Sequence, residues 1–217
     1  LNKTQNFKEV VFVCNKYLKE SFGTSRLHNI SAIAYVELNE LEKAIQSFKN
    51  SVQLSPQNAE NINNLAVAYL KNSQPNNAVK QFRAALSISP DNPKFLFNLS
   101  STLDQLNFKE EAENIYKRII QISPDHFDAN RNLVLLYNEK RDFKKAIKVC
   151  EEFVKIKPDD YDFLNLFALF CQRTGITKKA INIYLSLLEK NCDDHPIHNN
   201  LGLCYLDLGF NNLAGEH

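Results

Sequence analysis

Cysteine and histidine are the residues of this chain whose side chains could most readily bind a metal ion or carry out redox chemistry. The chain has five cysteines, but no two of them have the Cys-x-x-Cys spacing typical of zinc sites and redox-active pairs. The nearest approach to a ligand cluster is Cys192 with His195 and His198. One thiol and two imidazoles are too few for a structural zinc site. We therefore expect no metal site and no cofactor.

Residue types that serve in catalysis are present, but their surroundings do not suit it. The five glycines form no glycine-rich phosphate loop. Serine, histidine and aspartate occur, but none lies in a strand–turn–helix setting that would expose a nucleophile. The acidic pairs at 159–160 and 193–194 stand where helix capping explains them. The sequence therefore predicts no catalytic residue, and we expect no enzymatic activity within it.

A row of evenly spaced asparagines could bind an extended peptide. Asn64, Asn98 and Asn132 follow one another at a constant interval, and Asn200 lies two such intervals further on. A carboxamide offers one acceptor and two donors, so such a row could pair with the N–H and C=O groups of a peptide backbone. Alternatively, these asparagines cap or bridge neighbouring helices. Two apolar residues interrupt the row: Ile30 and Leu166.

The elements that would position these asparagines are indicated by a repeat of the same length. Alanine recurs in register at Ala44, Ala78, Ala112, Ala146, Ala180 and Ala214. Proline follows it on the same period at Pro56, Pro90, Pro124 and Pro158. A residue four places after each alanine is usually aromatic and shares its helix face. A period of about 34 residues predicts helical hairpins repeated along the chain.

This pattern resembles that of the tetratricopeptide repeat family, in which position 8 is small, 11 and 24 are aromatic, 20 is alanine and 32 is proline. The match spans essentially the whole chain, with the four prolines at position 32. It departs at position 4, where the family favours tryptophan and this chain has none, and at Cys192, which replaces a proline. The resemblance implies an all-α fold, a helix-turn-helix solenoid that forms a right-handed superhelix.

Signals for helix ends agree with this register. One hairpin should comprise helices near 25–38 and 41–55, and the same pair should recur once in every period. Position 15 should end the first helix in a left-handed conformation; it holds Asn39, Asn107, Gly175 and Gly209, with Ser73 and Arg141 as less suitable occupants. Position 34 should cap the next helix; it holds Asn58, Asn92, Asp160 and Asp194, with His126 as the exception.

The register divides the chain into one continuous repeat domain. Residues 1–24 should form the second helix of a repeat whose first helix is absent, and residues 195–217 a truncated sixth repeat. The complete repeats should be 25–58, 59–92, 93–126, 127–160 and 161–194. There is no initiating methionine and no capping helix with a polar outer face, so we expect a fragment of a longer protein.

The family resemblance also implies a binding surface. The first helix of each repeat would line a concave groove, and the asparagine row would resemble the asparagine ladder of O-linked N-acetylglucosamine transferase repeats. Position 9 would add an apolar stripe. The predicted peptide-binding residues are Asn64, Asn98, Asn132, Asn200, Asn63, Val67, Arg131, Leu135, Asn165 and Asn199. The cationic clamp by which chaperone-binding members of the family hold a C-terminal carboxylate is missing.

The net charge limits the classes of partner that we expect, and the placement of the cysteines indicates the compartment. With 26 basic and 25 acidic residues, the net charge of +1 creates no field for nucleic acid or an anionic membrane. No apolar run approaches the roughly 20 residues of a spanning helix. Cys14 and Cys150 occupy position 24 and Cys171 position 11, both core positions. An odd number of buried thiols indicates a reducing compartment, so we expect a cytoplasmic protein.

The favoured function is a scaffold or adaptor that binds a peptide or partner protein in the groove. One alternative is the substrate-recognition arm of a larger glycosyltransferase- or sulfotransferase-like enzyme. Another is a structural or self-association module, a homo-oligomer formed through the groove or the ends of the array. RNA binding is disfavoured by the period and the near-neutral charge.

Overall fold

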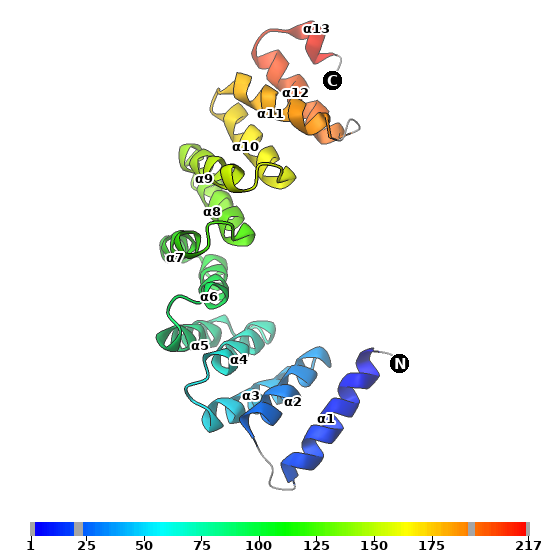
Figure 1. Ribbon diagram of the computed structural model, residues 1–217, viewed down its shortest axis with the longest axis vertical. Helices are drawn as coiled ribbons and strands as arrows, with labels where there is room; N and C mark the ends of the chain where they lie inside the picture. Colours follow the sequence, from blue (N-terminus) through cyan, green and yellow to red (C-terminus); the bar gives the residue numbers. More distant parts are fainter. Residues whose placement is uncertain (1–2, 20–23, 191–193, 216–217) are drawn as a thin grey trace. The chain divides into compact units, whose positions relative to one another are not determined.

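The computed structural model describes residues 3–19, 24–190 and 194–215, and every regular element in these ranges is an α-helix (Figure 1). The chain opens with α1 (Lys3–Lys19). The first helices of the hairpins, here called A helices, are α2 (Ser25–Glu37), α4 (Ala59–Lys71), α6 (Pro93–Gln105), α8 (Phe127–Glu139), α10 (Tyr161–Arg173) and α12 (His195–Asp207). The second, or B, helices are α3 (Leu41–Leu54), α5 (Pro75–Ile88), α7 (Lys109–Ile122), α9 (Phe143–Ile156), α11 (Thr177–Leu188) and α13 (Asn211–Ala214). The predicted all-α fold is confirmed.

The helices follow the predicted period. Successive A helices begin one period apart from Ser25 to His195, and successive B helices do so from Leu41 to Asn211. The expected helices 25–38 and 41–55 are observed as 25–37 and 41–54. In α1 the period would place the helix start at Phe7, whereas the helix begins at Lys3. Cys14 of this helix is buried, as its alignment with the core aromatic column predicts.

All six turns between an A helix and its B helix have the same backbone geometry. Position 15 has a positive φ, between 55° and 79°, at Asn39, Ser73, Asn107, Arg141, Gly175 and Gly209. In the first turn the Asn39 N–H donates to Val36 O (3.0 Å) and the Glu40 N–H to Tyr35 O (2.9 Å), and equivalent bonds recur in the other five. This is the Schellman motif, which satisfies the last helix carbonyls. The turn imposes its geometry even on serine and arginine.

Arg141→Gly is expected to stabilise the protein by about 1 kcal/mol, because an L side chain in the left-handed region costs roughly that much. The reverse change at the equivalent position, Gly175→Ala, should destabilise it by a similar amount. No atom lies within 4 Å of a Cβ added at Gly175, so its cost is confined to the backbone. Urea unfolding measures both. A destabilised Arg141→Gly variant would contradict the explanation.

The close crossings predicted within each hairpin are buried. The alanines at position 20, from Ala44 to Ala180, are all 0% exposed, as are Ala32, Ala66, Ser100, Val134 and Ala168 at position 8. Small side chains there let two helices approach, while the aromatics at positions 11 and 24 fill the space beside them. Tyr116 and Tyr184 at position 24 are 0% exposed. The sixth alanine at position 20, Ala214 in the short helix α13, is only half-buried.

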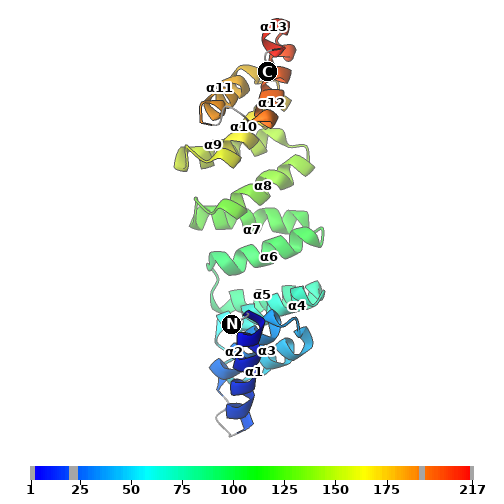
Figure 2. The ribbon, with the colours of Figure 1, turned by 90° about the vertical axis from the view of Figure 1, so that its right-hand side faces the viewer.

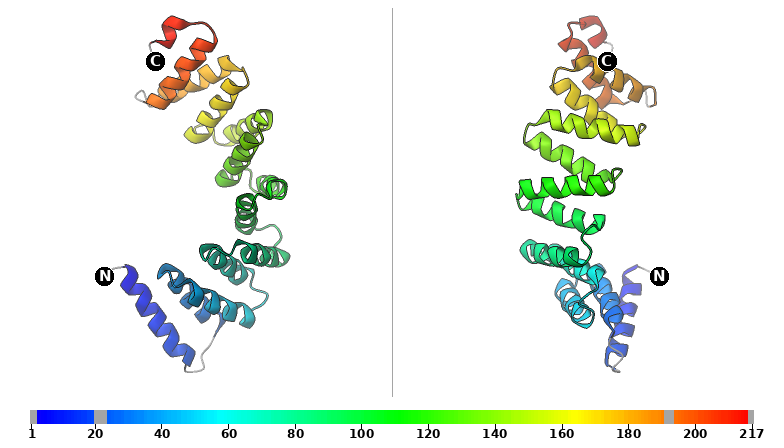
Figure 3. Two further views of the ribbon diagram at one scale, coloured as in Figure 1. Left: turned by 180° about the vertical axis from the view of Figure 1, so that it is seen from behind. Right: turned by 60° about the vertical axis from the view of Figure 1, so that its left-hand side comes forward.

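The chain forms two compact units, residues 1–115 and 116–217, which divide within α7. In the first unit each helix from α1 to α6 packs on the next, apparent for α2 to α6 in Figure 2. In the second unit α8 to α13 pack in the same sequential way; Figure 3 shows α8 to α12 from green to orange. A cluster of Ala59, Ile62, Ala85 and Phe95 joins α4, α5 and α6 in the first core. None of the described helices is long and apolar enough to cross a bilayer.

Candidate peptide-binding surface

The A helices that carry the predicted site begin at side-chain caps. Asn58, Asn92, Asp160 and Asp194 each accept a hydrogen bond from a backbone N–H of the first turn, as predicted. His126, the expected exception, caps its helix as well, because its Nδ1 accepts from the Ala129 N–H (3.2 Å). The imidazole ring therefore caps this helix in place of an asparagine side chain. Each A helix begins at a fixed residue, which fixes the register of its binding side chains.

In the first unit the asparagines link neighbouring A helices. Asn64 Nδ2 on α4 donates to Asn29 Oδ1 on α2 (3.3 Å). Asn98 Nδ2 on α6 donates in the same way to Asn63 Oδ1 on α4 (3.0 Å). The bridging role, which the sequence left as an alternative, is therefore present for both. Asn64 and Asn98 are half-buried, and each retains a second N–H and its carbonyl oxygen for another partner.

In the second unit the equivalent asparagine turns toward a B helix. Asn132 Nδ2 donates to the Tyr116 hydroxyl on α7 (3.1 Å). Asn200 lies near Tyr184 in the corresponding place, but the Tyr184 hydroxyl meets no partner in hydrogen-bonding geometry among the described residues. Burial is the main cause that raises the pKa of Tyr184, and Asn200 is close enough to act in the opposite direction.

For Asn64, Asn98 and Asn132 the hydrogen-bond partner differs with the residue 16 positions before the asparagine. Asn64 and Asn98 are preceded at that distance by Phe48 and Phe82, which have no hydroxyl, and they bond the A helix instead. Asn132 is preceded by Tyr116, whose hydroxyl captures it. The identity of position 24, phenylalanine or tyrosine, was a signal in the sequence that the prediction did not use.

The remaining predicted residues differ in exposure. Asn63 is 1% exposed, so it can act on a ligand only through Asn98, which it orients. Val67, Leu135 and Asn165 are half-buried, and Arg131 and Asn199 are exposed. Side chains at the edges of the A helices also join neighbours: Lys94 pairs with Glu60, and Arg173 Nη1 donates to Asn138 Oδ1 (2.7 Å).

The structure brings two predicted residues, Asn64 and Val67, into one hollow of about 200 Å³ between α2 and α4. We call it the A-helix hollow. Its apolar wall includes Ile33, which is 43% exposed. Two charged residues that the prediction omitted, Glu37 and Lys71, also line it, and both occupy position 13. The hollow combines a carboxamide, an apolar wall and charges of both signs, which suits an extended peptide.

The cysteines offer no chemistry to this surface. Cys14, Cys150, Cys171 and Cys204 are buried free thiols, and Cys192 lies outside the described residues. Burial raises the pKa of Cys150 to about 12 and those of Cys171 and Cys204 to about 11. No group of three or more histidine, cysteine, aspartate or glutamate residues in the described ranges is placed to hold a metal ion.

In a Cys192→Ser variant we expect negligible reaction of thiols with a disulfide reagent at pH 8 while the protein is folded. Thiolate is the reactive form, and pKa values of about 11 or 12 leave almost none of it at Cys150, Cys171 and Cys204 at that pH. Burial also raises the pKa of Cys14. Absorbance of the released chromophore measures the reaction, and all thiols should react in urea. Fast labelling of the folded variant would contradict the burial of these side chains.

The chain matches known repeat models over much of its length. A model described as TPR repeat matches residues 33–73, and two described as tetratricopeptide repeat match residues 69–130 and 128–160. No match was found among the curated proteins.

Several solved structures resemble the chain. The C-terminal part of a TPR repeat-containing protein from Cytophaga hutchinsonii is 16% identical with a TM-score of 0.82, covering 99% of this chain and 90% of that one. MamA is 21% identical with a TM-score of 0.67, covering 76% of this chain and 91% of that one. YrrB, described as a TPR protein with an unusual peptide-binding site, is 16% identical with a TM-score of 0.65, covering 85% and 94%. Identities this low show a shared fold alone.

Proposed function

This chain belongs to the tetratricopeptide repeat family, and we propose that it is a protein-interaction scaffold that binds an extended peptide or partner segment along its A helices. The observation that carries the proposal is the A-helix hollow, where Asn64 lies beside Val67 and Ile33. The carboxamide can bond a peptide backbone, while the apolar wall can take a side chain. The peptide-binding site named for YrrB, a protein of similar fold, is consistent with this.

Along the first unit, Asn98 would extend the contact from α4 to α6. Its bridge to Asn63 holds the carboxamide in one orientation, so less side-chain entropy is lost when a peptide binds. In the second unit we propose contacts from Arg131, Asn132, Leu135, Asn165, Asn199 and Asn200. Glu37 and Lys71 would favour a peptide with charges of both signs near the A-helix hollow.

Replacing Asn64, Asn98 and Asn132 together by alanine is expected to weaken peptide binding by about 1–3 kcal/mol, from about 0.5–1.5 for each net hydrogen bond. Val67→Asp should instead change which peptides bind, because side-chain pockets carry specificity. The measurement is fluorescence anisotropy with peptides selected from a random library against the wild-type chain.

The matched control is a triple variant of Asn76, Asn114 and Asn182, which are exposed asparagines on B helices. Because Asn64, Asn98 and Asn132 also bridge helices, their replacement lowers stability, and affinities are compared well below the unfolding transition. Unchanged affinity in the first triple variant, or an equal loss in the control, would exclude the asparagine row from binding.

Self-association is a second candidate, favoured by exposed apolar residues near α12. Leu203, Leu206 and Phe210 are 47%, 52% and 54% exposed. A second copy of the chain could cover such a surface. Sedimentation velocity would show a dimer that Leu206→Asp dissociates; a monomer at all concentrations would remove this candidate. We also propose a reducing compartment, such as the cytoplasm, from the buried free thiols.

A further inference from the structure

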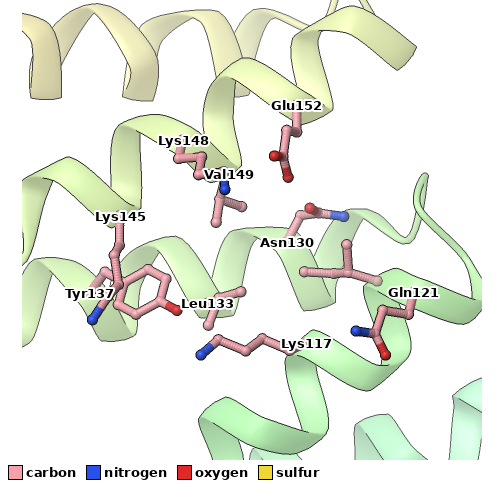
Figure 4. Close-up of a pocket in the computed structure, with 10 residues that line it drawn as sticks. Lys117, Gln121, Asn130, Leu133, Tyr137, Lys145, Lys148, Val149 and Glu152 are labelled. Carbon is pink, nitrogen blue, oxygen red and sulfur yellow. The ribbon is translucent and has the colours of Figure 1, made fainter.

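A larger hollow lies between two B helices of the second unit. It measures about 440 Å³ and is lined by residues of α7 and α9 on its two sides, with α8 between them (Figure 4). We call it the B-helix hollow. Its volume falls in the range of ligand-binding pockets, about 300–1,000 Å³. None of the residues proposed to bind a peptide on the A helices lines it.

The B-helix hollow lies beside a polar residue at position 4. This position is apolar in the hairpins on either side, as Leu96 and Leu164, but Asn130 in the hairpin of α8 and α9. Asn130 Nδ2 donates to two backbone oxygens, Pro124 O (3.0 Å) and His126 O (2.9 Å). Its carboxamide is therefore held against the start of α8, where a branched apolar side chain would have filled the space between helices.

The chemistry of the B-helix hollow combines an apolar floor with a mainly cationic edge. Ile120, Leu133 and Val149 supply apolar surface. Three lysines, at 117, 145 and 148, and one glutamate, Glu152, carry the charges. Lys145 is paired with Asp142 at 2.7 Å, whereas Lys148 makes no ion pair within the described residues. The charge of Lys148 at this edge favours an anionic ligand.

We infer that the B-helix hollow is a second docking site, which binds an acidic segment of a partner protein by one large apolar side chain. The hollow is half-open to solvent, whereas pockets for small molecules enclose most of their ligand. A side chain that projects from a peptide needs only such a half-open site, with its backbone outside. A carboxylate flanking that side chain would meet Lys148. This site is independent of the one proposed on the A helices.

The test uses a phage-displayed library of random short peptides, selected on the wild-type chain and depleted on its Lys148→Glu variant. We expect peptides in which aspartate or glutamate flanks phenylalanine, leucine or tryptophan. Synthesised with a fluorescent label, they should bind Lys148→Glu about ten-fold more weakly than wild type. Val149→Trp, which fills the hollow, should also weaken them, and added salt should do so for the wild-type chain.

Lys80→Glu is the matched control. Lys80 on α5 and Lys148 on α9 both occupy position 22 of their repeats. This substitution should leave affinity within about two-fold. The Asn64, Asn98 and Asn132 triple alanine variant should also bind these peptides normally, which separates this site from the A helices. Urea melts establish that each variant is folded. A selection that yields no peptide sensitive to Lys148→Glu, or peptides that bind Val149→Trp as tightly as wild type, would overturn the inference.

Discussion

Phe163→Ala should destabilise the protein by about 3–5 kcal/mol, the usual cost of removing a buried phenylalanine ring. Phe163 on α10 is 0% exposed and stacks on Phe153 of α9, with ring centroids 3.8 Å apart and an interplanar angle of 27°. The edge of Phe127 from α8 meets Phe163 at 5.4 Å and 82°. These three rings join one hairpin to the first helix of the next, so their loss opens the contact between repeats.

The measurement is urea unfolding followed by far-ultraviolet circular dichroism. Phe108→Ala is the matched control, because Phe108 is 55% exposed and its removal should cost within about 0.5 kcal/mol. Phe163→Leu should fall between the two, since it keeps much of the apolar volume. In a solenoid the repeats are stabilised by their neighbours, so the transition of Phe163→Ala should also broaden. Equal costs for Phe163→Ala and Phe108→Ala would contradict the assignment of this core.

The repeat period predicted the fold because every level of the sequence supports it. Alanine at position 20 is buried where the two helices of a hairpin cross. Position 15 has a positive φ in every turn, whichever residue occupies it. The serine and arginine at this position show that tertiary context overrides local preference. His126 shows the same, because a histidine takes the capping role of asparagine. Backbone geometry that recurs in every repeat can thus be predicted from the repeat period, even where one repeat has a residue that does not favour that geometry.

The surface was less predictable than the fold because each polar side chain chooses among several near partners. The row of asparagines was recognised, but the bonds of Asn64, Asn98 and Asn132 differ with the tyrosine or phenylalanine that precedes each on the neighbouring B helix. The B-helix hollow beside Asn130 depends on a rotamer set by two backbone oxygens. Such choices need coordinates, since the sequence gives the position of a residue on its helix but not the direction of its side chain.

The second large effect should come from adding volume at a helix crossing. Ala146 on α9 and Val134 on α8 are both 0% exposed, and these helices pack against each other within one hairpin. A leucine at 146 has no space, so the helices must separate or adopt strained rotamers. Ala146→Leu should therefore destabilise the protein by about 1–3 kcal/mol or more.

The control for Ala146→Leu is a substitution on the same helix, α9. Lys148 lies two residues away and is exposed, so Lys148→Ala should change stability by no more than about 0.5 kcal/mol. Ala146→Ser adds a single oxygen atom and should cost less than Ala146→Leu, although its hydroxyl needs a helix carbonyl as partner. A graded loss from serine to leucine at 146, beside little change at 148, is what steric exclusion at the crossing requires. Similar costs at both positions would mean that α8 and α9 do not meet through Ala146, and the alanine repeated at position 20 would then need another explanation.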